Sequence, residues 1–452
     1  MEFISPIDAA FLLGESREHP MHVGSLQLFE APEDAGPDFA QRTHEMLLEH
    51  RDFDPTFRKR PAKLWGTPQL AWSQEDEVDI DYHVRRSALP SPGGIAQLLE
   101  LASDLHSVLL DRHRPLWEIH LIEGLGDGRF ALYSKMHHAL IDGVAAQRLV
   151  QRTLTSDASS HEALVPWQLP RRQKRTESPG GSTLSGVARN LRSAAAAAPA
   201  ALRVARAALL QQQLTLPFAA PRTMFNVPIG GARRCAMRSW PLERIRQVKK
   251  ATGSTVNDVV LTMSAGALRG YLLERNALPD KPLIAMVPVS LRGEDDNGDQ
   301  SGVKVGAILC NLGTDVADPL ERLRVVSESM CRSKEIYRSL SSTQTMALSA
   351  LMLSPLALTL LPGIVSLTNP PFNIVISNVP GPRETMYWNG ARLDATYPMS
   401  IPFDGQAVNI TLTTNAENLD FGLVGCRRSV PRLERLLDHL EQSLTALEEA
   451  AL

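Results

Sequence analysis

The most informative segment of the sequence is KMHHALIDGV, Lys135–Val144. His137 and His138 end a predicted strand, and Asp142 and Gly143 follow at a turn into a predicted helix. A histidine at the end of a strand is held by the sheet while its ring faces the cavity beyond. A neutral imidazole, with a pKa near about 6.5, suits removal of a proton from a hydroxyl, thiol or amine. We therefore expect a general base here.

The residues after the two histidines should shape the loop. Asp142 is close enough in sequence to fold back beneath the strand end and fix the loop through an ion pair or backbone bonds, and Gly143 would permit a tight turn. A His-His pair is more often structural than catalytic. A metal site built from His138 and Asp142 has no further cluster of His, Asp or Glu at ligand spacing to support it, so we expect no metal.

Other catalytic signatures are missing from the sequence. No GxSxG elbow occurs, and no cysteine stands in a recognisable catalytic setting. GLGDG (Gly124–Gly128) is a GxGxG in a predicted hairpin turn rather than between a strand and a helix, so it is not a dinucleotide or phosphate loop.

Strand and helix patterns alternate on both sides of the histidines. In the first half, WEIHLIE and RFALYSKMH flank GLGDG as a β-hairpin, and MHVGSLQLF (Met21–Phe29) alternates like a half-buried strand. IAQLLELASDLHSVLL and GVAAQRLVQRTL show helical spacing. In the second half, STVNDVVLTMSAGALRGYLLE is a predicted helix that Ser254 or Thr255 can cap, with Asp258 in its first turn.

The remaining segments of the second half complete a mixed α/β pattern. LIAMVPVS, VKVGAILCNL and PFNIVISNVPGP are predicted strands, and AVNITLTTNAENLDFGLVGC is a hairpin with its turn near Glu417 and Asn418. An amphipathic helix closes the chain. We predict an N-terminal domain over residues 1–165, a basic helical linker over 166–235 and a C-terminal domain over 236–452.

Composition sets the class of protein. The chain has 452 residues, 43% of them hydrophobic, which is enough for two or three globular domains. Its net charge of -3 argues against a nucleic-acid binder, which normally shows a basic excess. The four cysteines are far apart and form no CxxC pair, which fits a reducing compartment. The N-terminus has no basic region of the kind that precedes a signal peptide, so we expect a cytoplasmic protein.

Two segments depart from the average composition. From Pro166 to Cys235 there are eleven basic residues and one acidic residue, which indicates either a solvated linker helix or a contact with anionic lipid headgroups. From Ser339 to Pro382 there is no Asp, Glu, Lys or Arg. Prolines interrupt this apolar run, so a buried or membrane-grazing helix pair is expected rather than a transmembrane helix. Core packing and the wall of a dry tunnel would require the same residue types.

A set of motifs resembles one known family. HHALIDG fits HHxxxDG, the signature of acyltransferases of the chloramphenicol acetyltransferase-like superfamily, which includes nonribosomal condensation domains. Further matches are Pro115-Leu116-Trp117, Asn257-Asp258 in VNDVVL, PFNIVISNVPGP, and the N-terminal SPIDAAFLLGESREHPMHVGSLQLFE. Together they resemble the bacterial wax ester synthase/diacylglycerol acyltransferase family over nearly the whole chain.

The resemblance implies a fold and a reaction. We expect two chloramphenicol acetyltransferase-like domains joined by the helical linker, with an active-site tunnel at their interface. Long-chain acyl-CoA would enter from one side, and a fatty alcohol or diacylglycerol from the other, giving wax ester or triacylglycerol without a bound cofactor. The enzyme would work in the cytoplasm, peripherally on the inner membrane or on lipid droplets.

The resemblance also implies roles for residues. His138 would be the general base, His137 its less direct neighbour and Asp142 structural. Asn257 would help to stabilise the oxyanion, and Pro115, Leu116 and Trp117 would buttress the strand that leads to His138. The residues expected beside the substrates are Gly143, Asp258, Ser377 and Asn378. Asp258 would also brace its helix, and Ser377 and Asn378 would line the domain interface.

Two other functions remain open at this point. A stand-alone condensation enzyme acting on carrier-bound acyl groups shares HHxxxDG but does not readily explain VNDVVL, SNVPGP and the N-terminal motif. A catalytically silent lipid-binding protein of the same fold is disfavoured by the intact His138 and Asp142.

Overall fold

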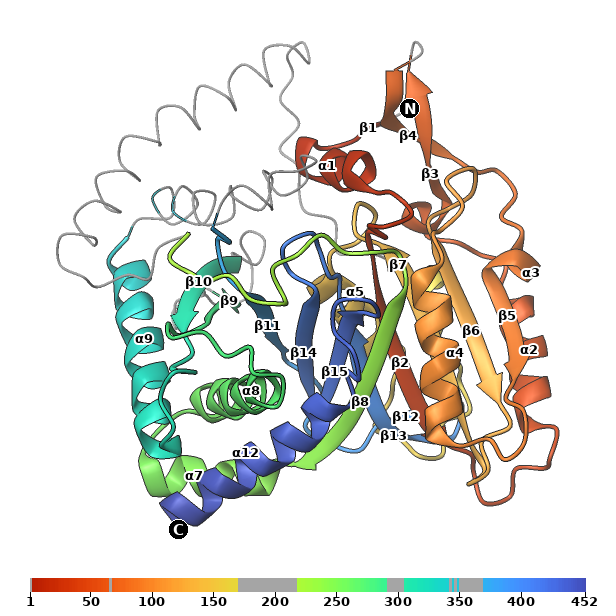
Figure 1. The fold of residues 1–452 in the computed structure, drawn as a ribbon. Helices are drawn as coiled ribbons and strands as arrows, with labels where there is room; N and C mark the ends of the chain where they lie inside the picture. The colour runs from red at the N-terminus through yellow and green to blue at the C-terminus, as the bar shows by residue number, and fades with distance from the viewer. Residues whose placement is uncertain are drawn as a thin grey trace.

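The computed structural model describes residues 2–64, 67–169, 218–290, 305–340 and 369–452, together with Gln344 and Leu348. Its described part forms two large mixed sheets that lie beside each other, with helices packed on both (Figure 1). Most of the predicted basic linker, and most of the uncharged run after Ser339, lies outside the described residues.

The N-terminal sheet contains the strand that carries the two histidines. Its order is β12 (Tyr387–Trp388), β13 (Ala391–Met399), β2 (His22–Glu30), β7 (Arg129–His137), β6 (Trp117–Glu123) and β5 (Val84–Ala88). The predicted hairpin is confirmed, since β6 and β7 pair antiparallel around a turn in which Gly124 and Gly128 adopt positive φ. The predicted strand over Met21–Phe29 is confirmed as β2, but the prediction that it is only half-buried is wrong. β2 lies between β13 and β7, and both of its faces are covered.

The C-terminal sheet has the order β10 (Val305–Asn311), β9 (Ile284–Ser290), β11 (Ile374–Val379), β14 (Val408–Asn415), β15 (Asn418–Cys426) and β8 (Arg233–Pro241). The predicted hairpin is β14–β15, and its turn falls at Ala416 and Glu417 because Asn415 and Asn418 already pair across the strands. A small third sheet consists of β1 (Glu2–Phe3), β4 (Thr67–Gln74) and β3 (Lys59–Leu64).

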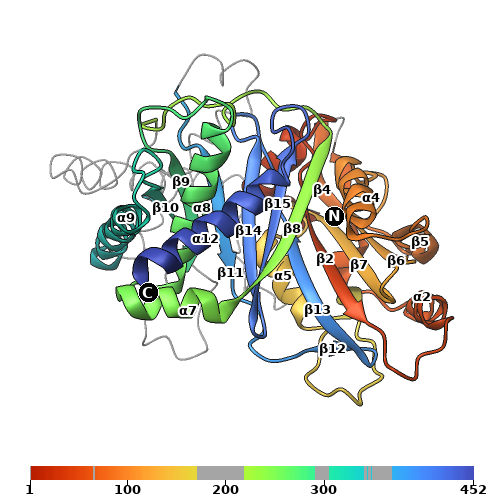
Figure 2. The same ribbon diagram turned by 60° about the horizontal axis from the view of Figure 1, so that its bottom comes forward.

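The helices divide between the two sheets. With the N-terminal half are α1 (Pro6–Gly14), α2 (Phe39–Glu49), α3 (Ile80–His83), α4 (Ile95–Ser107) and α5 (Gly143–Gln151). With the C-terminal half are α7 (Leu242–Thr252), α8 (Val256–Leu273), α9 (Pro319–Ser339) and α12 (Arg435–Ala451), of which α7, α8 and α12 lie together (Figures 1 and 2). No helix among the described residues is both long and apolar enough to cross a membrane.

A segment from the second half of the sequence belongs to the N-terminal sheet. Strands β12 and β13 belong by sequence to the second half, yet β13 pairs along β2 in the N-terminal sheet. Figure 2 shows β13 and β2 beside β8 of the other sheet. Both described ends of the predicted linker are packed as well: Trp167 lies in the N-terminal core, and Phe225 lies in the C-terminal core. The halves are therefore joined by structure as well as by the connecting segment.

Candidate active site

His137 ends β7 and His138 is the next residue, so the alternation of side chains along an extended chain favours opposite faces of the N-terminal sheet for the two rings. His137 is the last residue of β7, and its amide donates to the Leu116 carbonyl at 3.0 Å. The amide of His138 donates to the Met21 carbonyl at 2.8 Å, so the pairing with the β2 side of the sheet extends one residue past the strand. Both backbone positions are thus fixed by neighbouring strands.

The His138 ring is half-buried and stacks on Phe11 of α1, with ring centroids 4.0 Å apart. Its Nδ1 is buried without a hydrogen bond to a described residue, whereas Nε2 is not among the buried unpaired atoms. Of the two ring nitrogens, Nδ1 is the buried one, which leaves Nε2 as the candidate to face a substrate hydroxyl. Burial lowers the pKa of His138 to about 4, although the charge of Asp142 and the residue's own backbone act in the opposite direction. This differs from the ordinary imidazole expected from the sequence.

The His137 ring is held from both nitrogens. Nδ1 accepts a hydrogen bond from the Ala139 amide at 3.0 Å, so the proton of the neutral ring sits on Nε2. Nε2 lies 3.3 Å from Oε1 of Glu15, and the two side chains are 0% and 1% exposed. His137 is therefore fixed in one tautomer, facing a buried carboxylate.

Glu15 is a site residue that the sequence reasoning missed. Its carboxylate accepts from the Met21 amide at 3.1 Å and pairs with Arg112 at 2.9 Å. Burial opposes ionisation, but the contacts with His137, Met21 and Arg112 prevail and lower the pKa of Glu15. The residue directly follows α1 and lies within the N-terminal motif, but nothing in that motif assigned it a contact with the histidines.

Asp142 has a local structural role. It is the N-cap of α5, and its Oδ1 accepts from the Ala145 amide at 2.8 Å while the residue as a whole is exposed. The turn does not use the conformational freedom that Gly143 was expected to supply. Gly143 is the first residue of the helix, its φ is not left-handed, and an added Cβ would make only an ordinary contact with Val23 at 3.6 Å.

Asn257 and Asp258 open helix α8. The side chains of Thr255 and Asp258 form a capping box: Asp258 Oδ2 accepts from the Thr255 amide at 3.0 Å, and Thr255 Oγ1 accepts from the Asp258 amide at 3.2 Å. The capping residue is therefore Thr255 rather than Ser254. Asn257 is half-buried, and its side-chain amide has no hydrogen-bond partner among the described residues. It stands in the first turn, where unpaired backbone N–H groups give the helix end a partial positive charge.

The Pro115-Leu116-Trp117 turn lies directly against the end of β7, through the bond from His137 to Leu116. Trp117 is fully buried, donates from Nε1 to the Phe57 carbonyl at 2.9 Å, and stacks between His83 and Trp167. The turn therefore ties the histidine strand to the core of the N-terminal half.

Ser377 and Asn378 lie near the end of β11 and are half-buried. The strand continues into Pro380, whose carbonyl accepts from Nε2 of Gln151 at 2.9 Å. Gln151 is the last residue of α5, the helix that begins at Asp142. Helix α5 thus runs from the histidine loop to the exit of β11 and links the two halves of the molecule.

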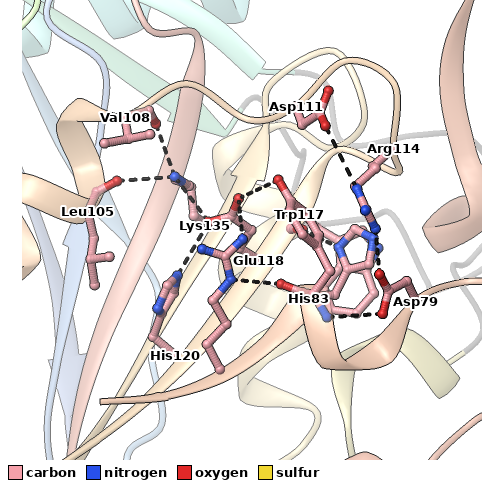
Figure 3. Close-up of polar contacts among 12 residues, drawn as sticks. Asp79, His83, Leu105, Val108, Asp111, Arg114, Trp117, Glu118, His120 and Lys135 are labelled. Atoms are coloured by element: carbon pink, nitrogen blue, oxygen red, sulfur yellow. Dashed lines mark hydrogen bonds and ion pairs between the residues drawn. The ribbon is translucent and has the colours of Figure 1, made fainter. Parts of the chain in front are cut away.

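A second polar cluster involves Lys135, Glu118 and His120 (Figure 3). Lys135 is 1% exposed, lies 3.4 Å from Glu118 Oε2, and donates to the carbonyls of Leu105 and Val108. Burial opposes the charge of Glu118, but His120, Lys135 and Arg85 prevail and lower its pKa to about 2. Through the bonds of Lys135 to Leu105 and Val108, this cluster fixes the end of α4 to the sheet. No group of three or more potential metal ligands occurs in the described ranges.

Comparison with family models shows which protein family the chain belongs to. Residues 4–260 match the wax ester synthase/diacylglycerol acyltransferase catalytic domain, and residues 301–448 match the WS/DGAT C-terminal domain. The chain belongs to the wax ester synthase/diacylglycerol acyltransferase family. The resemblance drawn from HHALIDG and its companion motifs is therefore confirmed.

Relatives of this WS/DGAT family member are similar over their whole length. A putative diacylglycerol O-acyltransferase of Mycobacterium bovis is 59% identical, with 100% of this chain and 99% of the relative covered. Another of Mycobacterium tuberculosis is 55% identical, with 99% of each covered. The match extends through both halves of the chain.

Solved structures confirm the fold class. The wax ester synthase/diacylglycerol acyltransferase of Marinobacter aquaeolei is 41% identical, with all of both chains covered and a TM-score of 0.81. The first condensation domain of the calcium-dependent antibiotic synthetase is 17% identical, with 100% of this chain and 96% of that chain covered and a TM-score of 0.62. At that identity the likeness shows the shared fold alone. The WS/DGAT chain thus has the predicted two-domain acetyltransferase-like architecture.

Proposed function

We propose that the protein transfers a long-chain acyl group from acyl-CoA to the hydroxyl of a diacylglycerol or a fatty alcohol, with His138 as the general base. The observation that carries the proposal is the position of the His138 ring: its backbone amide is held by the Met21 carbonyl, and its ring stacks on Phe11. The full-length similarity to diacylglycerol O-acyltransferases supports the same chemistry.

The reaction would proceed without an acyl-enzyme. Nε2 of His138 takes the proton from the acceptor hydroxyl as its oxygen attacks the thioester carbonyl. The carbonyl electrons move to oxygen, and the tetrahedral oxyanion lies beside the newly formed imidazolium. When the oxyanion collapses, the C–S bond breaks, and the leaving CoA thiolate takes the proton back from His138. Acyl ester and free CoA are the products.

The lowered pKa of His138 is compatible with this role. A base with a pKa of about 4 is unprotonated at neutral pH and therefore ready to accept a proton. Burial penalises the imidazolium, but a neighbouring oxyanion of opposite charge offsets that penalty in the transition state. The side-chain amide of Asn257, at the positive end of α8, is the proposed donor to the oxyanion.

Substitution of His138 tests the proposal. His138→Ala should lower kcat by about 10²–10⁴-fold, the usual contribution of a general base, and should leave the melting temperature near that of the wild type. Asn257→Ala should lower kcat by about 10²–10³-fold. His113→Ala, at an exposed histidine, is the matched control. A His138→Ala protein that folds and still releases CoA thiol at the wild-type rate would refute the assignment.

The place of action is also a proposal. We propose a cytoplasmic enzyme that binds the surface of the inner membrane or of lipid droplets through its basic segment, most of which lies outside the described residues. Each basic residue near an anionic surface contributes about 1 kcal/mol. Replacing Arg189, Arg192, Arg203 and Arg206 by Gln should weaken co-sedimentation with anionic liposomes at low salt, and unchanged co-sedimentation would contradict the proposal.

A further inference from the structure

The segment between α1 and β2, residues 15–21, contacts both the histidines and the C-terminal half of the molecule; we call it the Glu15 loop. Toward the site, Glu15 lies 3.3 Å from His137, and the carbonyl of Met21 accepts from the amide of His138 at 2.8 Å. The loop has no regular secondary structure. The positions of both histidines therefore depend on what holds this short segment in place.

His19 connects the Glu15 loop to Asp404, which lies in the segment between β13 and β14. Nε2 of His19 is 2.8 Å from Oδ1 of Asp404, and the same oxygen accepts from the Ile229 amide at 2.8 Å. Burial opposes ionisation of Asp404, but the contacts with His19 and Ile229 prevail and lower its pKa. Nδ1 of His19 lies 2.9 Å from the hydroxyl of Ser16, the residue that follows Glu15. One imidazole thus joins a carboxylate of the C-terminal half to the neighbour of Glu15.

Arg233 of β8 makes a second contact with the loop and is only 2% exposed. Its Nη2 donates to the Glu18 carbonyl at 2.9 Å, and its Nη1 donates to the Gly230 carbonyl. Burial lowers the pKa of Arg233 to about 10, so the guanidinium remains charged at neutral pH. An added Cβ on Gly231 would lie 2.2 Å from the carbonyl oxygen of Arg17, so the two backbones are in direct contact. Three successive residues of the Glu15 loop therefore rest on the C-terminal half.

We infer that Asp404 and Arg233 are positioning residues for the proposed general base; this rests on the proposed function. They hold the Glu15 loop, and the loop holds His137 and His138, although neither Asp404 nor Arg233 touches the reacting atoms. The base is then correctly placed only while the two halves are docked at this loop. Misplacing a reacting group by about 1 Å can lower the rate by about 10²-fold, and a displacement transmitted through a loop should cost less, about tenfold.

Substitution of Asp404 tests the inference. Asp404→Ala removes the acceptor for His19 and should lower kcat by about tenfold. The KM values for acyl-CoA and for the acceptor should stay near those of the wild type, because no substrate contact is removed. Asp404→Asn keeps an oxygen that faces His19 and should restore most of kcat. CoA thiol release gives the kinetic constants, and thermal unfolding shows that the variants are folded.

The matched control is Asp394→Ala. Asp394 also comes from the second half of the sequence, and it pairs with Arg129 at the end of β7 remote from the histidines. The exposed fractions of this pair, 21% and 29%, are close to the 25% and 21% of His19 and Asp404. Its loss should lower the melting temperature without changing kcat. If Asp404→Ala and Asp394→Ala lowered kcat equally, Asp404 would have only a general stabilising role.

A double-mutant cycle with Glu15→Gln distinguishes positioning through the loop from an independent effect. Because side chains that act along one route are not additive, Asp404→Ala should lower kcat much less in the Glu15→Gln background than in the wild type. Two losses that multiply fully would overturn the inference. Wild-type kcat in a folded Asp404→Ala protein, or a raised KM with unchanged kcat, would overturn it as well.

The contact can also be tested from the side of the loop. His19→Ala should reproduce the loss of kcat, and it keeps the bond from Ile229 to Asp404, so it serves if Asp404→Ala does not fold. His19→Gln can still donate to Asp404 and should recover part of kcat, whereas wild-type kcat in His19→Ala would overturn the inference. A folded His138→Ala protein with wild-type turnover would instead refute the proposed function. The two failures are therefore distinguishable.

Discussion

The Glu15 carboxylate lies 3.3 Å from Nε2 of His137, and both side chains are almost fully buried. Glu15 also accepts from the amide of Met21, whose carbonyl accepts from the amide of His138. One carboxylate therefore fixes the His137 ring directly and the His138 backbone through Met21. The loop that carries Glu15 also contacts the C-terminal half, where Nε2 of His19 lies 2.8 Å from Oδ1 of Asp404.

Replacing Glu15 should disturb the position of the proposed base. Glu15→Gln keeps an acceptor for Met21 but removes the charge that faces Arg112 and His137. We expect kcat to fall by roughly up to 10²-fold, the cost of misplacing a reacting group by about 1 Å, and stability to fall by about 1–3 kcal/mol. Kinetics and thermal unfolding measure the two effects. Glu18→Gln, at an exposed position of the same loop, should change neither, and wild-type kcat in Glu15→Gln would contradict this positioning role.

The pH dependence of the reaction should reveal the buried state of His138. The base acts when unprotonated, so kcat/KM should fall only as pH drops through about 4, the pKa lowered by burial. An unperturbed imidazole would already lose half of its activity at about pH 6.5. Thiol release from acyl-CoA, measured from acid to neutral pH with saturating acceptor, distinguishes the two. Phe11→Ala uncovers the ring and should move the acid limb upward; an inflection near neutral pH in the wild type would contradict the assignment.

Asp142 should matter for stability through its cap rather than its charge. Asp142→Ala removes the acceptor for the Ala145 amide and should cost about 1 kcal/mol, the usual value of an N-cap. Asp142→Asn keeps an acceptor oxygen and should cost much less. Thermal unfolding of the two variants checks this. Equal destabilisation by Asn and Ala would show that the negative charge, and not the cap, is what the loop requires.

Local patterns were sufficient to predict much of this fold. The β6–β7 hairpin, helix α8 and the β14–β15 hairpin all depend on neighbouring residues, and turn glycines or capping side chains mark their ends. Strand β13 could not be assigned in this way. Its place beside β2 depends on pairing between distant parts of the chain, and its residues alone do not specify a partner.

The candidate site likewise contains residues that local sequence predicts and residues that only contacts across the fold reveal. His137, His138 and Asp142 lie close together in the sequence, so their motif could be recognised from the sequence alone. The role of Glu15 could not, because it arises from a contact made across the fold; the N-terminal motif contains Glu15 but does not show that it faces His137. The pKa of His138 was likewise beyond the sequence, since it depends on burial and on the ring of Phe11 packed against it.

Asp420 should make the stability of the protein depend on pH. The residue lies on β15, is 0% exposed, and accepts from the Thr396 amide of β13 at 2.8 Å, so it joins the two sheets. Burial raises its pKa to about 7, against the hydrogen bonds of Ser239, Thr396 and Asn415.

The sign of this effect follows from the raised pKa. The unfolded chain releases the Asp420 proton at about pH 3.9, whereas the folded protein keeps it to about pH 7. Stability should therefore be highest below that window, fall as pH rises through it, and level off above it. Thermal unfolding of Asp420→Asn, which keeps an acceptor for Thr396, should lose this part of the pH dependence. Asp315→Asn, at an exposed position, should keep it, and parallel curves for wild type and Asp420→Asn would show that Asp420 is ionised in the folded protein throughout the range.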